Sequence, residues 1–146
     1  MQATPESPFR ILLVEDNKGD VLLLRKCFER SRRAYEMRVV HDGSELFGAM
    51  FDSEANKAWP DIIMLDINLP RVTGLKALEA LRQVPEMRPI PVLMLTSSFA
   101  DDEIERAKIL GAKGHVVKGS RFALEDIMSF ANAAKNDKEL WIYVGR

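Results

Sequence analysis

The sequence predicts an α/β fold, a three-layer sandwich in which helices cover both faces of a parallel sheet. Short apolar runs rich in β-branched residues alternate with longer stretches of helical spacing, which is typical of strand–helix–strand units. Three of these runs, 11–14, 62–65 and 92–95, are apolar throughout, as expected of strands covered on both faces. Parallel strands joined by helices imply right-handed crossovers.

The elements follow one another in regular order. The predicted strands are 11–14, 37–40, 62–65, 92–95 and 115–117. After each strand, apolar residues recur three or four positions apart, which is the spacing of one helix face. In chain order these faces contain Val21, Leu24 and Phe28; Leu46, Phe47 and Met50; Ala77, Leu78 and Leu81; Ile104, Ala107 and Leu110; and Leu124, Ile127, Met128 and Ala131. Gly111 fits a C-cap that ends the fourth helix.

Composition and charge restrict the class of protein. The 146 residues carry a formal net charge of −1, so no global field draws the chain to nucleic acid or to an anionic membrane. No apolar run approaches the length of a membrane-spanning helix, and the first ten residues lack the pattern of a secretory signal. One cysteine excludes an internal disulfide and, with two histidines, disfavours structural zinc. We expect a cytoplasmic, single-domain protein.

Polar residues follow the predicted strands where the strands end. Glu15 and Asp16 follow the first strand, Asp66 ends the third, Thr96 follows the fourth and Lys118 the fifth. Each has an ordinary explanation, because strand-end carboxylates often cap the next helix and lysines are usually solvated. However, an open parallel sheet binds ligands beyond the carboxyl ends of its strands. The topology therefore predicts that these side chains meet at one edge.

Such a meeting indicates a metal site. Three adjacent carboxylates repel one another unless a cation or a proton offsets the charge. Oxygen ligands without histidine or cysteine suit a hard ion, and Mg²⁺ takes one or two carboxylates and keeps several waters. With Lys118 as an electrostatic clamp and Thr96 nearby, the set outlines a phosphoryl-transfer site.

Four dispersed motifs resemble a known family. Residues 13–17 (Leu-Val-Glu-Asp-Asn), 63–70 (Ile-Met-Leu-Asp-Ile-Asn-Leu-Pro) with Gly74, 95–97 (Leu-Thr-Ser) and 117–118 (Val-Lys) are similar to the receiver domain of two-component response regulators. The similarity spans roughly 9–134. It implies the flavodoxin-like (βα)5 fold, with a five-stranded parallel sheet of order 2-1-3-4-5.

The resemblance also implies roles for the strand-end residues. Asp66 would accept a phosphoryl group from a phosphohistidine of a sensor histidine kinase, with Lys118 pairing first with Asp66 and then with the phosphoryl group. Mg²⁺ would be held by Asp16, Asp66 and the backbone carbonyl of Asn68, with Glu15 acting mostly through water. The protein would then be a signalling phospho-acceptor with slow autodephosphorylation, and no conventional enzyme.

The implied switch departs from the family pattern. Thr96 would swing to the phosphoryl oxygen, and His115 occupies a position that is commonly aromatic. His115 is either a half-buried ring at a strand edge or a residue that moves inward with Thr96 and makes switching depend on pH near neutrality. Gly119 and Ser120 follow Lys118, where many receivers have proline.

The sequence predicts that the chain divides into three parts. We predict a flexible lead-in at 1–8, the receiver domain at 9–135 and a tail at 136–146. The apolar run Leu140–Val144 is unfavourable to leave in water. It either folds back on its own domain or forms an arm that makes a homodimer. Stand-alone receivers with such tails resemble the regulators partnered with bacterial phytochrome kinases.

Three other functions share part of this residue pattern. A haloacid-dehalogenase-type phosphatase needs a general acid two residues after its nucleophile, where this chain has Asn68. A flavodoxin-like cofactor binder is disfavoured because Glu15 and Asp16 would repel a phosphate. A receiver-fold interaction module with vestigial phosphorylation is the remaining alternative, and its downstream target, like that of the receiver, is not named by the sequence.

Overall fold

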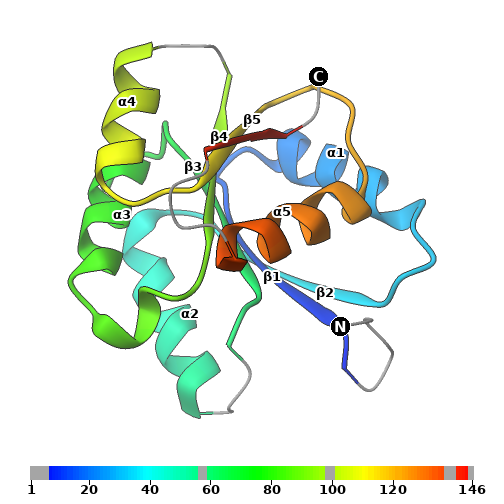
Figure 1. The fold of residues 1–146 in the computed structure, drawn as a ribbon, viewed down its shortest axis with the longest axis horizontal. Helices are drawn as coiled ribbons and strands as arrows, with labels where there is room; N and C mark the ends of the chain where they lie inside the picture. The colour runs from blue at the N-terminus through cyan, green and yellow to red at the C-terminus, as the bar shows by residue number, and fades with distance from the viewer. Residues whose placement is uncertain (1–6, 56–58, 98–100, 137–140, 145–146) are drawn as a thin grey trace.

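The computed structural model describes residues 7–55, 59–97, 101–136 and 141–144 and shows one parallel sheet with helices on both faces (Figure 1). The strand order is β2-β1-β3-β4-β5-β6. The predicted order 2-1-3-4-5 is confirmed, and a short sixth strand extends it. The strands are β1 (Phe9–Val14), β2 (Tyr35–Val40), β3 (Ile62–Asp66), β4 (Val92–Thr96), β5 (Gly114–Val117) and β6 (Ile142–Val144).

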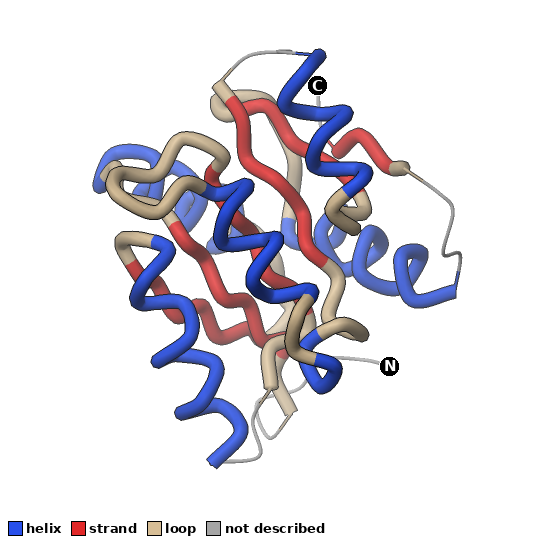
Figure 2. The backbone as a smooth tube through the Cα atoms, turned by 90° about the vertical axis from the view of Figure 1, so that its left-hand side faces the viewer, coloured by secondary structure: helices blue, strands red, loops and turns tan. Residues whose placement is uncertain are grey.

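Five α-helices connect the strands within the described residues. They are α1 (Lys18–Glu29), α2 (Gly43–Ala55), α3 (Gly74–Arg82), α4 (Asp101–Ile109) and α5 (Leu124–Asn136). Helices α2, α3 and α4 cover one face of the sheet, and α1 and α5 cover the other. Figure 2 shows the helices in blue on both sides of the red strands. Among the described residues, every helix is too short or too polar to span a lipid bilayer.

Two apolar layers form the core, one on each side of the sheet. Alternate residues of the central strands point to opposite faces. Leu12 and Ile63 accordingly pack with the α2–α4 layer, whereas Ile11 and Met64 pack with the α1–α5 layer. Every residue of β3 and β4 is buried, as the unbroken apolar runs predicted.

The sixth strand is formed by part of the tail. Ile142–Val144 pairs in parallel with β5, and Ile142 lies in register with Gly114. A Cβ atom at Gly114 would lie 2.1 Å from the carbonyl oxygen of Ile142, so the close approach of this strand requires glycine. In this chain the described tail residues thus lie on their own domain, and a homodimer through the tail stays a prediction. Residues 1–6 of the predicted lead-in lie outside the described residues.

Candidate functional site

Three carboxylates meet where β1 and β3 end. One carboxylate oxygen from each of Glu15, Asp16 and Asp66 lies within 4.8 Å of the others. Glu15 and Asp66 are buried, and Asp16 is exposed. The two strands are neighbours in the sheet, with Val14 in register with Leu65. The residues that directly follow or end these strands are therefore brought together, as the sequence indicated.

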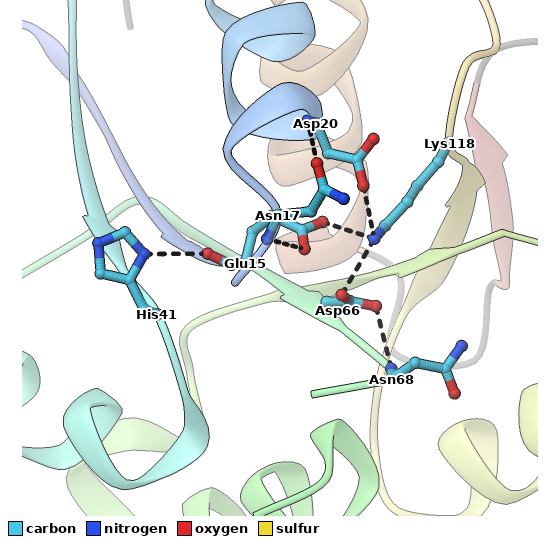
Figure 3. Close-up of polar contacts among 7 residues, drawn as sticks. All are labelled: Glu15, Asn17, Asp20, His41, Asp66, Asn68 and Lys118. Carbon is cyan, nitrogen blue, oxygen red and sulfur yellow. Dashed lines mark hydrogen bonds and ion pairs between the residues drawn. The ribbon is translucent and has the colours of Figure 1, made fainter. Parts of the chain in front are cut away.

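Lys118 binds this cluster from the end of β5. Its Nζ lies 2.7 Å from Oε1 of Glu15, 3.0 Å from Oδ2 of Asp66 and 3.0 Å from Oδ2 of Asp20 (Figure 3). The Lys118 backbone N–H donates to the carbonyl oxygen of Thr96 at 2.7 Å, which fixes the start of the side chain beside β4. One ammonium group thus offsets the charge of several carboxylates.

Burial sets the charge state of this cluster. Desolvation raises the pKa of Glu15 to about 7, against the opposing effect of its contact with Lys118. Burial alone would lower the pKa of Lys118, but its bonds with Glu15, Asp66 and Asp20 raise that pKa above the usual value. Lys118 is therefore a permanent cation at neutral pH, and a cation bound beside Glu15 would favour the ionised carboxylate.

The first turn of α1 carries a residue that the sequence analysis did not single out. Asn17 caps this helix, because its Oδ1 accepts a hydrogen bond from the Asp20 backbone N–H at 3.0 Å. Asp20 is the carboxylate that reaches Lys118 from the helix side. An acidic residue in the first turn is ordinary in any helix, so nothing in the sequence distinguished it.

The segment after β3 holds Asp66 by its backbone. The Asn68 backbone N–H donates to Oδ1 of Asp66 at 3.0 Å, and the Asn68 side chain points away from Lys118 (Figure 3). A Cβ atom at Gly74 would lie only 2.0 Å from the Asp66 carbonyl oxygen, so α3 can begin here only with glycine. The role of the Asn68 carbonyl as a metal ligand stays a prediction.

The two predicted switch residues lie on neighbouring strands. Thr96 ends β4 and is buried, and His115 in β5 is in register with Met94. Residues two apart on a strand share a face, so Thr96 and His115 are on the same side of the sheet. The ring Nδ1 of His115 accepts a hydrogen bond from the Trp141 indole N–H at 3.0 Å.

The environment of His115 changes the expected pH range. Burial, followed by the nearby charge of Lys108, lowers the pKa of His115 below its usual 6.5. Titration of this ring in the folded chain is therefore shifted toward acid pH, and its role in a pH-dependent switch stays a prediction.

The donor set fits a divalent cation that prefers oxygen. Glu15, Asp16 and Asp66 offer carboxylate oxygens from buried and exposed sides, with no histidine or cysteine in the group. Such a set suits Mg²⁺ or Mn²⁺ better than zinc or copper.

Comparison with known proteins gives a consistent family. The model of the response regulator receiver domain matches residues 11–131. The probable methanogenesis regulatory protein FilR2 of Methanothrix harundinacea (strain 6Ac) is 31% identical over 138 residues, covering 94% of this chain and 86% of that protein. The phosphorylated cyanobacterial phytochrome response regulator RcpA has a TM-score of 0.70 and 29% identity, with 88% of this chain and 90% of that chain covered. The Mn²⁺-bound form of response regulator Rcp1 has a TM-score of 0.67 and 30% identity, with 88% and 93% covered.

Proposed function

This chain belongs to the response regulator receiver domain family, and we propose that it accepts a phosphoryl group on Asp66 from a sensor histidine kinase. The observation that carries the proposal is the Asp66 carboxylate, buried beside two further carboxylates and 3.0 Å from the Lys118 ammonium. An aspartate with only a structural role would not need neighbouring carboxylates that repel it and an ammonium group that offsets their charge. The similar RcpA is known in a phosphorylated form, which supports the same chemistry here.

The reaction is a direct transfer between two side chains. A carboxylate oxygen of Asp66 attacks the phosphorus of a phosphohistidine whose other ring nitrogen carries a proton, the new O–P bond forms as the N–P bond breaks, and the electron pair of that bond returns to the ring, which leaves as neutral imidazole. Both the acceptor and the entering group are anionic, so Lys118 offsets their repulsion and then donates to a phosphoryl oxygen. Asn68 keeps Asp66 oriented through its backbone N–H.

We assign the metal as Mg²⁺, with Asp16, Asp66 and the Asn68 carbonyl as protein ligands and Glu15 acting mostly through water. The ion supplies further neutralisation of the phosphoryl charge. The Mn²⁺-bound structure of Rcp1 supports a divalent ion of this class. Glu15 then serves to hold Lys118 and to keep Asn17 in place, since its Oε2 accepts the Asn17 backbone N–H at 3.2 Å.

The kinase would dock over α1 beside the acidic cluster. Leu22 and Leu23 of α1 are adjacent large apolar side chains, each 53% exposed, and a docked partner would bury them. A cavity of about 580 Å³ lies next to Leu23, is lined also by Phe122 and Arg121, and reaches Lys118. A partner helix seated there would bring its phosphohistidine to Asp66.

The partner and the output follow from the same proposal. The similar RcpA is a phytochrome response regulator, which favours a phytochrome-type kinase as the phosphodonor, in the cytoplasm. Phosphorylation would draw Thr96 toward the phosphoryl oxygen, and His115 on the same sheet face would move with it, so that the signal passes by protein–protein contact. The tail at 136–146 would serve this output or a homodimer.

Intact mass spectrometry tests the proposal. The full chain is incubated with acetyl phosphate in the presence of Mg²⁺, in the presence of EDTA, and as the Asp66→Asn variant. One phosphoryl group should be added to the wild type with Mg²⁺ and under no other condition. Phosphorylation that persists in EDTA would contradict the metal assignment. No addition with acetyl phosphate, with a histidine kinase or with beryllofluoride would favour the interaction module.

A further inference from the structure

Lys118 is held by a carboxylate outside the acidic triad. An ammonium group has three N–H donors, and here three carboxylates surround it: Glu15, Asp66 and Asp20 (Figure 3). We propose that Asp20 is a positioning residue, which holds Lys118 in the resting site and yields it when Asp66 carries a phosphoryl group. The inference rests on the proposed function of Asp66.

The local hydrogen bonds leave the Asp20 carboxylate to Lys118. An acidic residue three positions after a helix N-cap commonly reaches back to the N-cap backbone N–H. In this chain the Asn17 N–H donates instead to Oε2 of Glu15 at 3.2 Å. Asn17 in turn accepts from the Asp20 backbone N–H, which fixes the first turn of α1. The Asp20 side chain is therefore directed at Lys118, 98 residues away in the sequence.

Burial decides which of the three carboxylates gives up the lysine. The side chains of Glu15 and Asp66 are 0% and 2% exposed, whereas that of Asp20 is 28% exposed. A carboxylate that loses its partner is solvated at low cost only where water reaches it. When phosphoryl oxygens are added at Asp66, Lys118 can turn away from Asp20 and keep its contact with Glu15.

Asp20 therefore competes with the phosphoryl group for one N–H of Lys118. Its removal should strengthen the binding of a phosphoryl group, by the modest amount expected of a partly exposed ion pair. This direction is opposite to that expected if Asp20 merely stabilised α1, because a disordered first turn would loosen the site and weaken binding.

Beryllofluoride, which mimics the phosphoryl group on an aspartate, measures this effect. We would titrate it into the full chain at saturating Mg²⁺ and follow the bound signal by ¹⁹F NMR. Asp20→Asn should bind about two- to fivefold more tightly than wild type. Its aspartyl phosphate, formed with acetyl phosphate, should persist longer by a similar factor. Glu29→Gln removes one negative charge from the exposed end of the same helix and should match the wild type.

The outcomes are distinguishable. Unchanged or weaker binding by Asp20→Asn would overturn the role of Asp20. An equal gain in Glu29→Gln would overturn it too, because the effect would then be one of net charge. A wild type that binds no beryllofluoride and takes up no phosphoryl group would overturn the proposed function of Asp66 itself.

Discussion

The Trp141 indole N–H donates a hydrogen bond to Nδ1 of His115 at 3.0 Å, and the two rings stack with centroids 5.6 Å apart. This contact ties the C-terminal tail to β5, the strand directly before Lys118. The ammonium of Lys108 lies 5.2 Å from the centroid of the Trp141 ring, so α4 contributes to the same cluster. The Trp141 side chain thus contacts both α4 and β5. A movement of His115 would therefore shift the tail that carries Trp141.

Trp141→Phe should loosen β6 without unfolding the domain. The substitution keeps an aromatic ring against His115 but removes the N–H donor, a loss of about 0.5–1.5 kcal/mol for one hydrogen bond. Amide hydrogen exchange at Ile142, whose N–H donates to the Lys113 carbonyl oxygen at 2.9 Å, should accelerate, while that of β3 stays slow. Trp59→Phe is the matched control, because Trp59, like Trp141, packs partly buried against the α2–α4 layer but belongs to the segment before β3. Equal exchange rates at β6 in both variants would show that the hydrogen bond does not hold the strand.

The docking of β6 should weaken as the pH falls below about 6.5. The folded chain lowers the pKa of His115 below its usual 6.5, so between the two values the folded state binds fewer protons than the undocked state. The stability from neutral His115 is then fully present above 6.5 and is lost as pH falls through this range. Protonation also converts Nδ1 to a donor that cannot accept the Trp141 N–H, and it places a second cation near Lys108.

Hydrogen exchange at β6 between pH 5 and 8, corrected for the intrinsic exchange rate, measures this dependence. The variant His115→Phe should remove it, because its ring cannot titrate. If the corrected exchange rate rises equally in the wild type and in the variant as the pH falls, His115 is not the group responsible.

Gly114→Ala should displace the tail strand. The added Cβ would lie 2.1 Å from the Ile142 carbonyl oxygen and 2.8 Å from the Phe130 ring, so either β6 or α5 must move. We expect a loss of about 1–3 kcal/mol, as for overpacking in a core, with faster exchange in β6. Gly48→Ala in α2 is the control, since its Cβ meets nothing within 4 Å and should stabilise the helix by about 0.5–1 kcal/mol. Urea unfolding of both variants gives the comparison.

Gly74→Ala should impair phosphorylation. Its Cβ would lie 2.0 Å from the Asp66 carbonyl oxygen and would push the start of α3 away from the site. The rate of phosphoryl addition from acetyl phosphate should fall at least tenfold, because small misplacements of a reacting group have large effects. If the variant folds and is phosphorylated at the wild-type rate, the segment after β3 adapts to the added Cβ without moving Asp66.

The sequence alone determined the layers and the acidic cluster. Unbroken apolar runs predict buried parallel strands, and the carboxyl ends of such strands meet at one edge whatever the remaining details. The convergence of Glu15, Asp16 and Asp66 therefore followed from topology, since each follows or ends a neighbouring strand.

The tertiary structure decided the contacts that depend on which of several equivalent side chains lies within reach. Asp20 looks like any acidic residue in a first helical turn, and only the fold brings its carboxylate to Lys118. The tail run was apolar enough to need burial, but its sequence fitted both a folded-back segment and an arm. Its pairing with β5, and the hydrogen bond from Trp141 to His115, depend on the close approach at Gly114. Local pattern fixes which face a residue takes, whereas a bond of 3 Å between distant segments depends on how every intervening element packs.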